Sequence, residues 1–296
     1  MPRLFQAYVM VDWSAAAKPA TGPDSIWIGV LKRNVRFQLA YEAHNPATRS
    51  EAEKLLQGVL DDLKRKSERV LVGFDFPLSF PRGTAAALKL EGAPWRAMLD
   101  FVAKEVKDKP TNENNRFQVG AKMNRLMTDG PFPFWGAPER DKQPWLSVKR
   151  VREHTPEDLP EFRYADTAAK GASSIWKLYY QGSVGGQALT GLPVVKRLRD
   201  AREHARIWPF ETGWRPLQPA DLENVDVVFA EIYPSLLSAK PDTGEIKDAA
   251  QIRTLAEYFA ALDEKNQLAP LFGPAKDDPR RAAVENEEGW ILGATP

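Results

Sequence analysis

The sequence predicts an α/β fold built on a mixed, five-stranded β-sheet flanked by helices, and three observations support this prediction. Short apolar runs typical of buried strands alternate with an amphipathic helical pattern over residues 48–66. The runs at 25–33 and 35–43 meet at a short turn around Asn34, which is typical of an antiparallel hairpin. An apolar strand then follows the helix, so the first and fourth strands should be parallel neighbours.

The first third of the chain supplies most of the predicted sheet. Residues 5–12, "FQAYVMVD", form the first strand, before the hairpin. The helix at 48–66 gathers its apolar residues on one face: Leu55, Leu56, Val59, Leu60 and Leu63. "RVLVGFDFP", residues 69–77, is the strand that follows, and Pro77 ends it.

The middle of the chain, residues 82–175, differs from both ends. It contains a helix near 94–107 and then stretches rich in proline and aromatic residues. Long segments without regular structure are usually functional lids or disordered, and the aromatic content favours order. We therefore expect one domain over 1–296, with a core at 1–81 and 176–296 and a mostly helical or irregular insertion packed on it.

The last third resumes the alternation of strands and helices. A basic helix over 194–205 should be capped by Thr190 or Gly191, with Pro193 in its first turn. Strands are expected in "ARIWPFE" and "VDVVFAEIYP", and a helix is expected over 247–265. The segment "ENEEGWILG" resembles a final strand.

Bulk composition excludes several classes of protein. The 296 residues carry a net charge of +1, so no global basic field indicates a nucleic-acid partner. The chain has no cysteine, which excludes disulfides, thiolate metal sites and a cysteine nucleophile. No apolar run approaches the length of about 18 residues that a membrane helix needs. We expect a soluble, cytoplasmic protein with no membrane partner.

Acidic residues end three of the predicted strands. Asp12, Asp75 and Glu231 each close an apolar run, and the carboxyl ends of parallel strands meet at one edge of a sheet. Asp248 opens the last long helix and could reach the same edge. Clustered carboxylates favour hard divalent cations, so the pattern predicts a site for Mg²⁺ or Mn²⁺.

Each acid also has a purely structural interpretation. Asp12 could cap a turn together with Ser14, and Asp75 could belong to a proline turn. Glu231 could pair with an arginine, and Asp248 could stabilise a helix amino terminus. Three strands with the same terminal acid are poorly explained by capping, which favours a shared site.

A second pattern concerns the substrate. "GSVGG", residues 182–186, could cradle a phosphate with its backbone amides, although a flexible turn is the simpler interpretation. Lys177 could meet the same phosphate or be solvated surface. The predicted substrate-binding residues are Ser14, Lys177, Gly182, Ser183, Gly185 and Gly186.

With these motifs the chain resembles a family of predicted ribonuclease H-like nucleases of unknown function. The resemblance rests on "VDWS", "GFDFPLSFP", "WKLYYQGSVGGQALTGLP", "RIWPFETG", "AEIYPSLL", "KDAAQIR" and "EEGWILG". It implies a ribonuclease H-like fold in which Asp12, Asp75, Glu231 and Asp248 are catalytic metal ligands. Such folds commonly carry another acid one turn further into the final helix, where this chain has Gln251 and Ile252.

The resemblance and the acids together predict a phosphodiester hydrolase that works by two-metal phosphoryl transfer on nucleic acid or a nucleotide. A second hypothesis is a nucleotide-binding or nucleotide-transfer protein in a cofactor pathway, such as molybdopterin dinucleotide formation. A third is a non-catalytic scaffold that keeps the fold and has lost a ligand.

Overall fold

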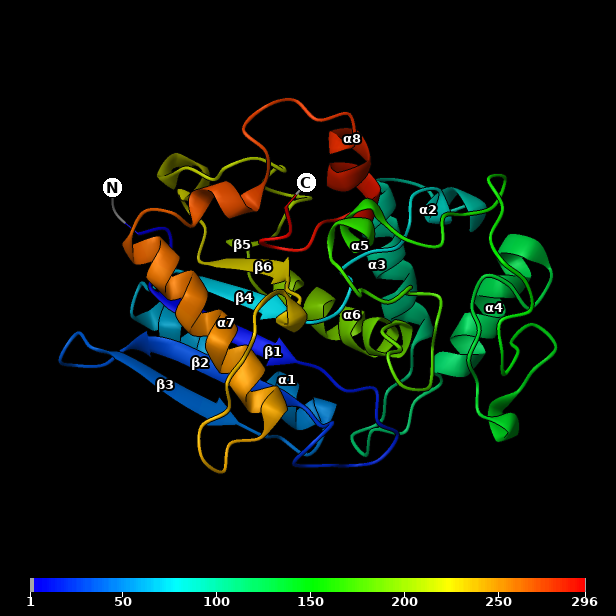
Figure 1. Cartoon of the computed structure of the whole chain (residues 1–296), viewed down its shortest axis with the longest axis horizontal. Helices are drawn as coiled ribbons and strands as arrows, with labels where there is room; N and C mark the ends of the chain where they lie inside the picture. The colour runs from blue at the N-terminus through cyan, green and yellow to red at the C-terminus, as the bar shows by residue number, and fades with distance from the viewer. Residues whose placement is uncertain (1–2, 296) are drawn as a thin grey trace.

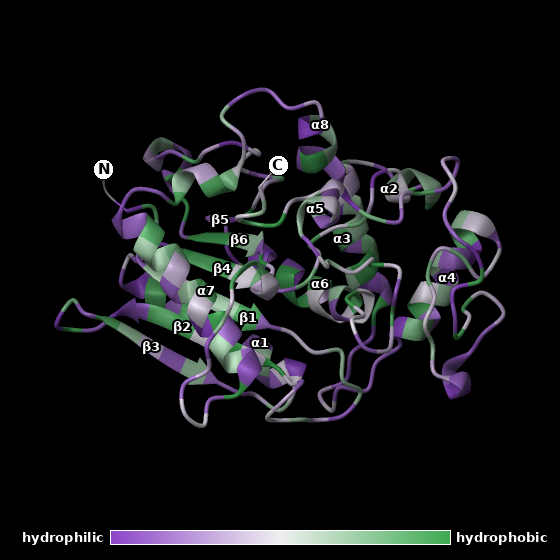
Figure 2. Ribbon diagram, viewed as in Figure 1, coloured by the Kyte–Doolittle hydropathy of each residue, from purple (hydrophilic) through white to green (hydrophobic). Residues whose placement is uncertain are grey.

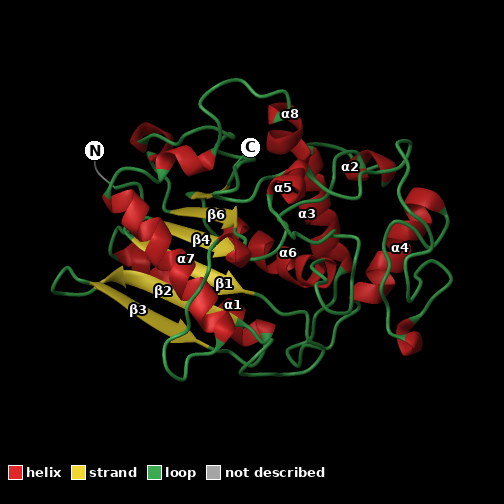
Figure 3. Ribbon diagram, in the orientation of Figure 1, coloured by secondary structure: helices red, strands yellow, loops and turns green. Residues whose placement is uncertain are grey.

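The computed structural model describes residues 3–295, and a six-stranded sheet forms its centre (Figure 1, Figure 3). The strands run in the spatial order β3-β2-β1-β4-β6-β5. Their bounds are β1 Ala7–Asp12, β2 Trp27–Arg33, β3 Leu39–His44, β4 Val70–Phe74, β5 Ala205–Ile207 and β6 Val227–Glu231. The sheet therefore has six strands rather than the five of the predicted fold, because β5, which lies in the segment "ARIWPFE" where a strand was expected, pairs with β6 at the edge.

The pairing of the strands brings the carboxyl ends of β1, β4 and β6 to the same edge of the sheet. β1 pairs antiparallel with β2, and β2 pairs antiparallel with β3, as the hairpin pattern predicts. β1 lies parallel to β4, and β4 lies parallel to β6, so the predicted neighbourhood of the first and fourth strands is confirmed. In this register Val11 faces Phe74, and Phe74 faces Glu231.

Helices cover both faces of the sheet. α1 (Arg49–Arg65) and α6 (Gly185–Asp200) contribute to the hydrophobic core on one face, and α7 (Lys247–Glu264) packs on β1 and β2 on the other. Figure 1 shows α7 crossing in front of the strands, and Figure 2 shows the central strands as predominantly hydrophobic. Every residue of β4 is buried, which is why this strand reads as a continuous apolar run rather than an alternation.

The start and the buried face of α1 both follow from its sequence. Thr48 caps α1 by accepting a hydrogen bond from the amide of Glu51 at 3.2 Å. The buried side chains recur at helical spacing and face the sheet: Ala52, Leu56, Leu60 and Leu63.

The insertion is more helical than its sequence suggests. It contains α2 (Thr84–Ala87), α3 (Pro94–Glu105), α4 (Arg116–Thr128) and α5 (Tyr164–Ala168), of which only α3 was expected. Most of its buried hydrophobic side chains, including Met98, Val119 and Phe134, belong to the same hydrophobic cluster as residues of β1, β4 and α6. In Figure 1 the insertion lies to one side of the sheet, with α4 furthest from it.

Two expected elements differ in the structure. α6 begins at Gly185, so neither Thr190 nor Gly191 is its cap, and Pro193 lies inside the helix. The poor helix propensity of Gly185 and Gly186 conceals the true start. "ENEEGWILG" forms no strand either, and only an isolated bridge joins Ile291 to Glu231.

Short helices complete the chain. They are α8 (Arg281–Ala283), the π-helical turn Val284–Glu288, and the 3₁₀ turns Glu139–Asp141, Pro219–Leu222, Pro234–Leu236 and Ala269–Phe272. Across residues 3–295, no helix combines the length and apolar character that a membrane span requires.

Candidate functional site

Two carboxyl groups meet where β1 and β4 end. Asp12 is the last residue of β1, and Asp75 directly follows β4. The amide of Asp75 donates to the carbonyl of Val11 at 3.1 Å, and the amide of Trp13 donates to Asp75 Oδ1 at 2.8 Å. The two side chains lie close enough for each carboxyl group to shift the pKa of the other. The parallel register thus produces the contact that the strand-end pattern predicts.

This pair is electrostatically costly when both groups are ionised. Burial raises the pKa of Asp12 well above its usual range, and the charge of Asp75 raises it further. Burial also raises the pKa of Asp75 to about 6, although hydrogen bonds from Asp12 and from the amide of Trp13 oppose that shift. A proton shared by the two carboxyl groups would relieve the repulsion, and a bound cation would do the same.

Asp248 stands near the pair, in the first turn of α7. Its negative charge raises the pKa of both Asp12 and Asp75. Its Oδ2 accepts the amide of Asp24 at 2.8 Å, so one oxygen is already used to hold the 24–25 turn. Asp248 therefore lies near Asp12 and Asp75 and adds to their negative charge, but one of its oxygens is already hydrogen bonded.

Glu231 is not free to bind a metal ion, because it forms a buried ion pair with Arg163. The guanidinium donates to both oxygens of Glu231 at 2.6 and 2.7 Å. Arg163 also donates to Asp166, at 2.7 Å. Arginine pairing, the structural interpretation of Glu231, is thus observed, and the partner comes from the insertion.

The charges of this triad compensate one another. Burial raises the pKa of Glu231, and Arg163 opposes the shift. For Arg163 burial favours the neutral form, yet the charges of Asp166 and Glu231 outweigh burial and raise its pKa. The two-pronged geometry keeps the ion pair charged, and both oxygens of Glu231 are engaged.

With Glu231 paired, Asp12 and Asp75 are the carboxyl groups that could bind a hard cation, and they do not form a complete set of metal ligands by themselves. Within residues 3–295, no group of three or more histidine, aspartate or glutamate side chains is placed to hold a metal ion. Mg²⁺, however, commonly binds through one or two carboxylates and completes its shell with waters and substrate phosphates. Asp12 and Asp75 meet that requirement, because they are desolvated, adjacent and short of a compensating positive charge.

A groove of about 1190 Å³ opens beside the pair. The lining side chains with functional groups include Asp12, Arg116, Tyr179, Tyr180, Gln187 and Asp248. A smaller hollow of about 290 Å³ adjoins it and is lined by Asp12, Asp75 and Glu231. The carboxylate pair therefore lies where a bound molecule could reach it.

The predicted substrate-binding residues divide into two groups. Ser14, Gly182 and Ser183 line the groove. Lys177 does not, because its Nζ donates to the carbonyl of Gln181 at 2.6 Å and lies over the ring of Trp135. Gly185 and Gly186 form the buried first turn of α6 behind the groove wall.

Two groove residues were missed at the sequence level. Gln187 donates through Nε2 to the carbonyl of Trp13 and to Asp75 Oδ2, the latter at 3.5 Å. Arg116 enters the groove from α4. The glycine pair just before Gln187 was a usable signal, whereas "NNRFQ" around Arg116 matches no motif.

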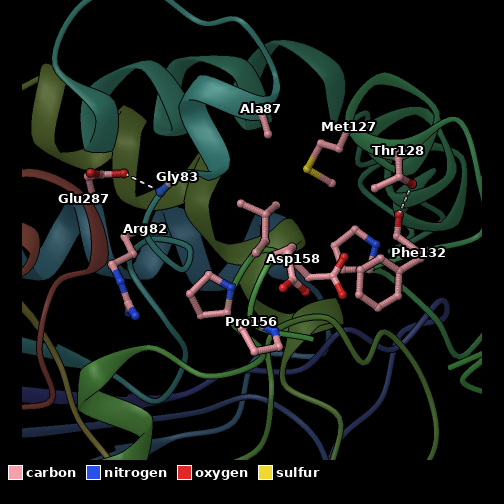
Figure 4. A pocket seen from close by; sticks show the side chains of 13 residues that line it. Arg82, Gly83, Ala87, Met127, Thr128, Phe132, Pro156, Asp158 and Glu287 are labelled. Carbon is pink, nitrogen blue, oxygen red and sulfur yellow. Dashed lines mark hydrogen bonds between the residues drawn. The ribbon is translucent and has the colours of Figure 1, made fainter. Parts of the chain in front are cut away.

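A separate hollow of about 710 Å³ lies within the insertion (Figure 4). Several of its polar groups are already engaged: the amide of Gly83 donates to Glu287 at 2.7 Å, and Asp158 pairs with Arg152. None of the predicted site residues lines it. It therefore lacks the desolvated, uncompensated charge that marks the Asp12–Asp75 edge.

Comparison with protein-family models, with curated proteins and with solved structures found no match. The resemblance to ribonuclease H-like nucleases therefore stays a prediction, and the six-stranded mixed sheet with helices on both faces is what the structure establishes.

Proposed function

We propose that this protein is a divalent-metal-dependent phosphodiester hydrolase whose metal-binding residues are Asp12 and Asp75. One observation carries the proposal: two carboxyl groups with raised pKa values, from neighbouring parallel strands, both line a hollow that adjoins an open groove, and Asp12 lines the groove as well. Their raised pKa values mean that an ion binding there would replace a shared proton.

Each of the surrounding residues has a defined task. A bound Mg²⁺ or Mn²⁺ would polarise a phosphate oxygen and lower the pKa of a bound water. Trp13 and Gln187 hold the carboxylate of Asp75 in place by donating to its two oxygens. Asp248 adds negative charge that favours a cation. Glu231, held by Arg163, supports the site as part of its floor rather than as a ligand.

Binding and hydrolysis of defined probes test the proposal. We expect Mn²⁺ to bind in a calorimetric titration and to support cleavage of a short single-stranded oligonucleotide. Asp12→Asn and Asp75→Asn should each lower the cleavage rate by at least about a hundredfold, because one ligand and one charge are lost. Asp277→Asn, at an exposed aspartate far from the groove lining, is the matched control and should leave the rate unchanged.

Three results would contradict the proposal. They are no Mn²⁺ binding, unchanged cleavage by Asp75→Asn, and full cleavage in EDTA, which would indicate acid–base chemistry by the pair instead. Metal binding without cleavage, together with thermal stabilisation by ATP or GTP, would favour the nucleotide-binding alternative. Metal binding with neither would favour the non-catalytic scaffold.

A further inference from the structure

Arg116 is a buried cation without a carboxylate partner. Only 5% of its surface is exposed, and its Nε is buried without a hydrogen-bond acceptor. Its one side-chain hydrogen bond among the described residues runs from Nη1 to the neutral amide oxygen of Asn114, at 3.0 Å. A buried charge without a counter-ion is costly, so this arrangement calls for an anion.

The carboxylates near Arg116 are committed elsewhere. Asp108 accepts both Nε and Nη2 of Arg49, at 2.6 and 2.7 Å. Asp141 pairs with Arg140 at 3.2 Å. Burial, together with the charge of the neighbouring Arg49, lowers the pKa of Arg116 to about 10. Among residues 3–295, Arg116 lies over the ring of Phe117 but has no carboxylate in ion-pair contact.

The amino terminus of α6 lies against the same arginine. A β-carbon placed on Gly186 would be only 3.3 Å from Arg116 Nε. α6 spans 16 residues and has no side-chain cap, and its first internal hydrogen bond runs from Ala188 to Val184. The amides of Gly186 and Gln187 have no acceptor within residues 3–295. The positively polarised amino terminus of α6 and the guanidinium of Arg116, whose Nε has no acceptor, thus lie side by side.

We propose that Arg116 and the amino-terminal end of α6 at Gln187, both of which line the groove, form a phosphate-binding subsite there. The subsite deepens the function proposed above and rests on it. Gln187 connects the two sites, since it follows the α6 turn directly and donates to Asp75. The phosphate held here is therefore a neighbour of the one to be cleaved, and it positions the chain across the carboxylate pair.

Two tyrosines identify the ligand as a nucleotide chain. Tyr179 and Tyr180 line the same groove, are 40% and 46% exposed, and have ring centroids 4.8 Å apart. Tyr180 has a φ of 75°, a left-handed backbone that is strained for a tyrosine. Exposed aromatic rings beside a phosphate subsite are what unstacked bases of a single strand bind. A duplex, with its bases already stacked, could not use these rings.

The test measures binding in EDTA, so that it is independent of metal and of cleavage. The probe is a short fluorescein-labelled oligothymidylate, followed by fluorescence anisotropy, with inorganic phosphate as competitor. We expect Arg116→Gln to weaken binding by about tenfold or more, because a charge-assisted contact is lost. Arg125→Gln removes the same charge from an exposed position on the same helix and should leave binding unchanged.

Further variants separate the subsite from a purely structural role. Arg116→Lys, which keeps the charge, should bind between wild type and Arg116→Gln and guards against a folding defect in the latter. Tyr180→Ala should weaken oligothymidylate binding but leave the inhibition constant of phosphate unchanged. Equal binding by folded Arg116→Gln, or no competition by phosphate, would overturn the subsite. Phosphate binding in a calorimetric titration, without oligothymidylate binding in the anisotropy assay, would overturn the nucleotide assignment and indicate a small phosphorylated ligand.

Discussion

Asp12 and Asp75 make the stability of the metal-free protein depend on pH in an unusual direction. The pKa of Asp75 is raised to about 6 in the folded protein, mainly by burial, so the folded state binds a proton more tightly than the unfolded state. The free energy of unfolding should therefore fall as the pH rises from about 4 to about 7, by on the order of 2 kcal/mol. Asp12 adds to the loss, because its pKa shifts in the same direction.

Urea unfolding in EDTA at several pH values checks this prediction. The quantity to follow is wild type minus Asp75→Asn, since ion pairs elsewhere contribute equally to both and cancel. Adding Mg²⁺ or Mn²⁺ near neutral pH should restore stability to the wild type only, because an ion then replaces the proton. A difference that is flat or rises with pH would mean that the pair is not desolvated as the structure indicates.

Arg163 carries a second prediction at the level of single residues. Arg163→Met would leave Glu231 and Asp166 buried without their cation, at a cost of about 3–5 kcal/mol in unfolding free energy. Adding Glu231→Gln should recover part of this loss, because the uncompensated charge is removed. Arg152→Gln, which breaks an exposed pair with Asp158, is the control and should change the unfolding free energy far less than Arg163→Met. Equal costs for the two arginine variants would contradict the buried-triad description.

These residues also mark the limit of what the sequence predicts. The positions of Asp12 and Asp75 could be predicted from the sequence, because each residue ends an apolar run and strand register follows from such runs. Pairing of Glu231 with an arginine was one of the interpretations, but the partner could not be identified, because Arg163 lies 68 residues away in an irregular segment. Arg116 gave no signal for a related reason: its significance is the absence of a partner, and only three-dimensional packing reveals that.

At the level of elements, α6 depends on glycines that allow close packing. A β-carbon on Gly191 would lie 2.2 Å from the ring of Phe76, which is buried directly after Asp75. Gly191→Ala should therefore destabilise the protein by about 1–3 kcal/mol, although alanine favours helix. Gly58 in α1 is the matched control, because nothing lies within 4 Å of its β-carbon position. Gly58→Ala should stabilise by up to about 1 kcal/mol in the same urea titration, and a stabilising Gly191→Ala would contradict the tight packing.

The same packing explains why the start of α6 was mispredicted. A β-carbon on Gly185 would lie 2.0 Å from the carbonyl oxygen of Ile175, so the position requires glycine for tertiary reasons. A prediction from helix propensity alone assigns such glycines to a turn, and it therefore places the start of the helix too late, near Pro193. Strands such as β4 and helices such as α1 and α7 follow their local patterns closely, because burial on one face or both repeats along each of them.

At the level of the whole molecule, the insertion behaves as part of the core rather than as a separate unit. Arg163 from the insertion neutralises Glu231 at the end of β6, and Arg116 reaches the α6 turn. α3 packs on α6, and its buried Met98, Leu99 and Val102 share one hydrophobic cluster with β1 and β4. Cooperative unfolding should therefore include both parts of the chain.

Native-state hydrogen exchange tests this cooperativity. Amides in α3 and in β4 should open with the same free energy, because the two elements share buried side chains and neither retains a complete core without the other. Arg163→Met should lower both opening energies together, whereas Gly58→Ala should raise both. If α3 exchanged at a distinctly lower free energy than β4, the insertion would be a separate cooperative unit. The contacts of Arg163 would then organise the site without contributing to global stability.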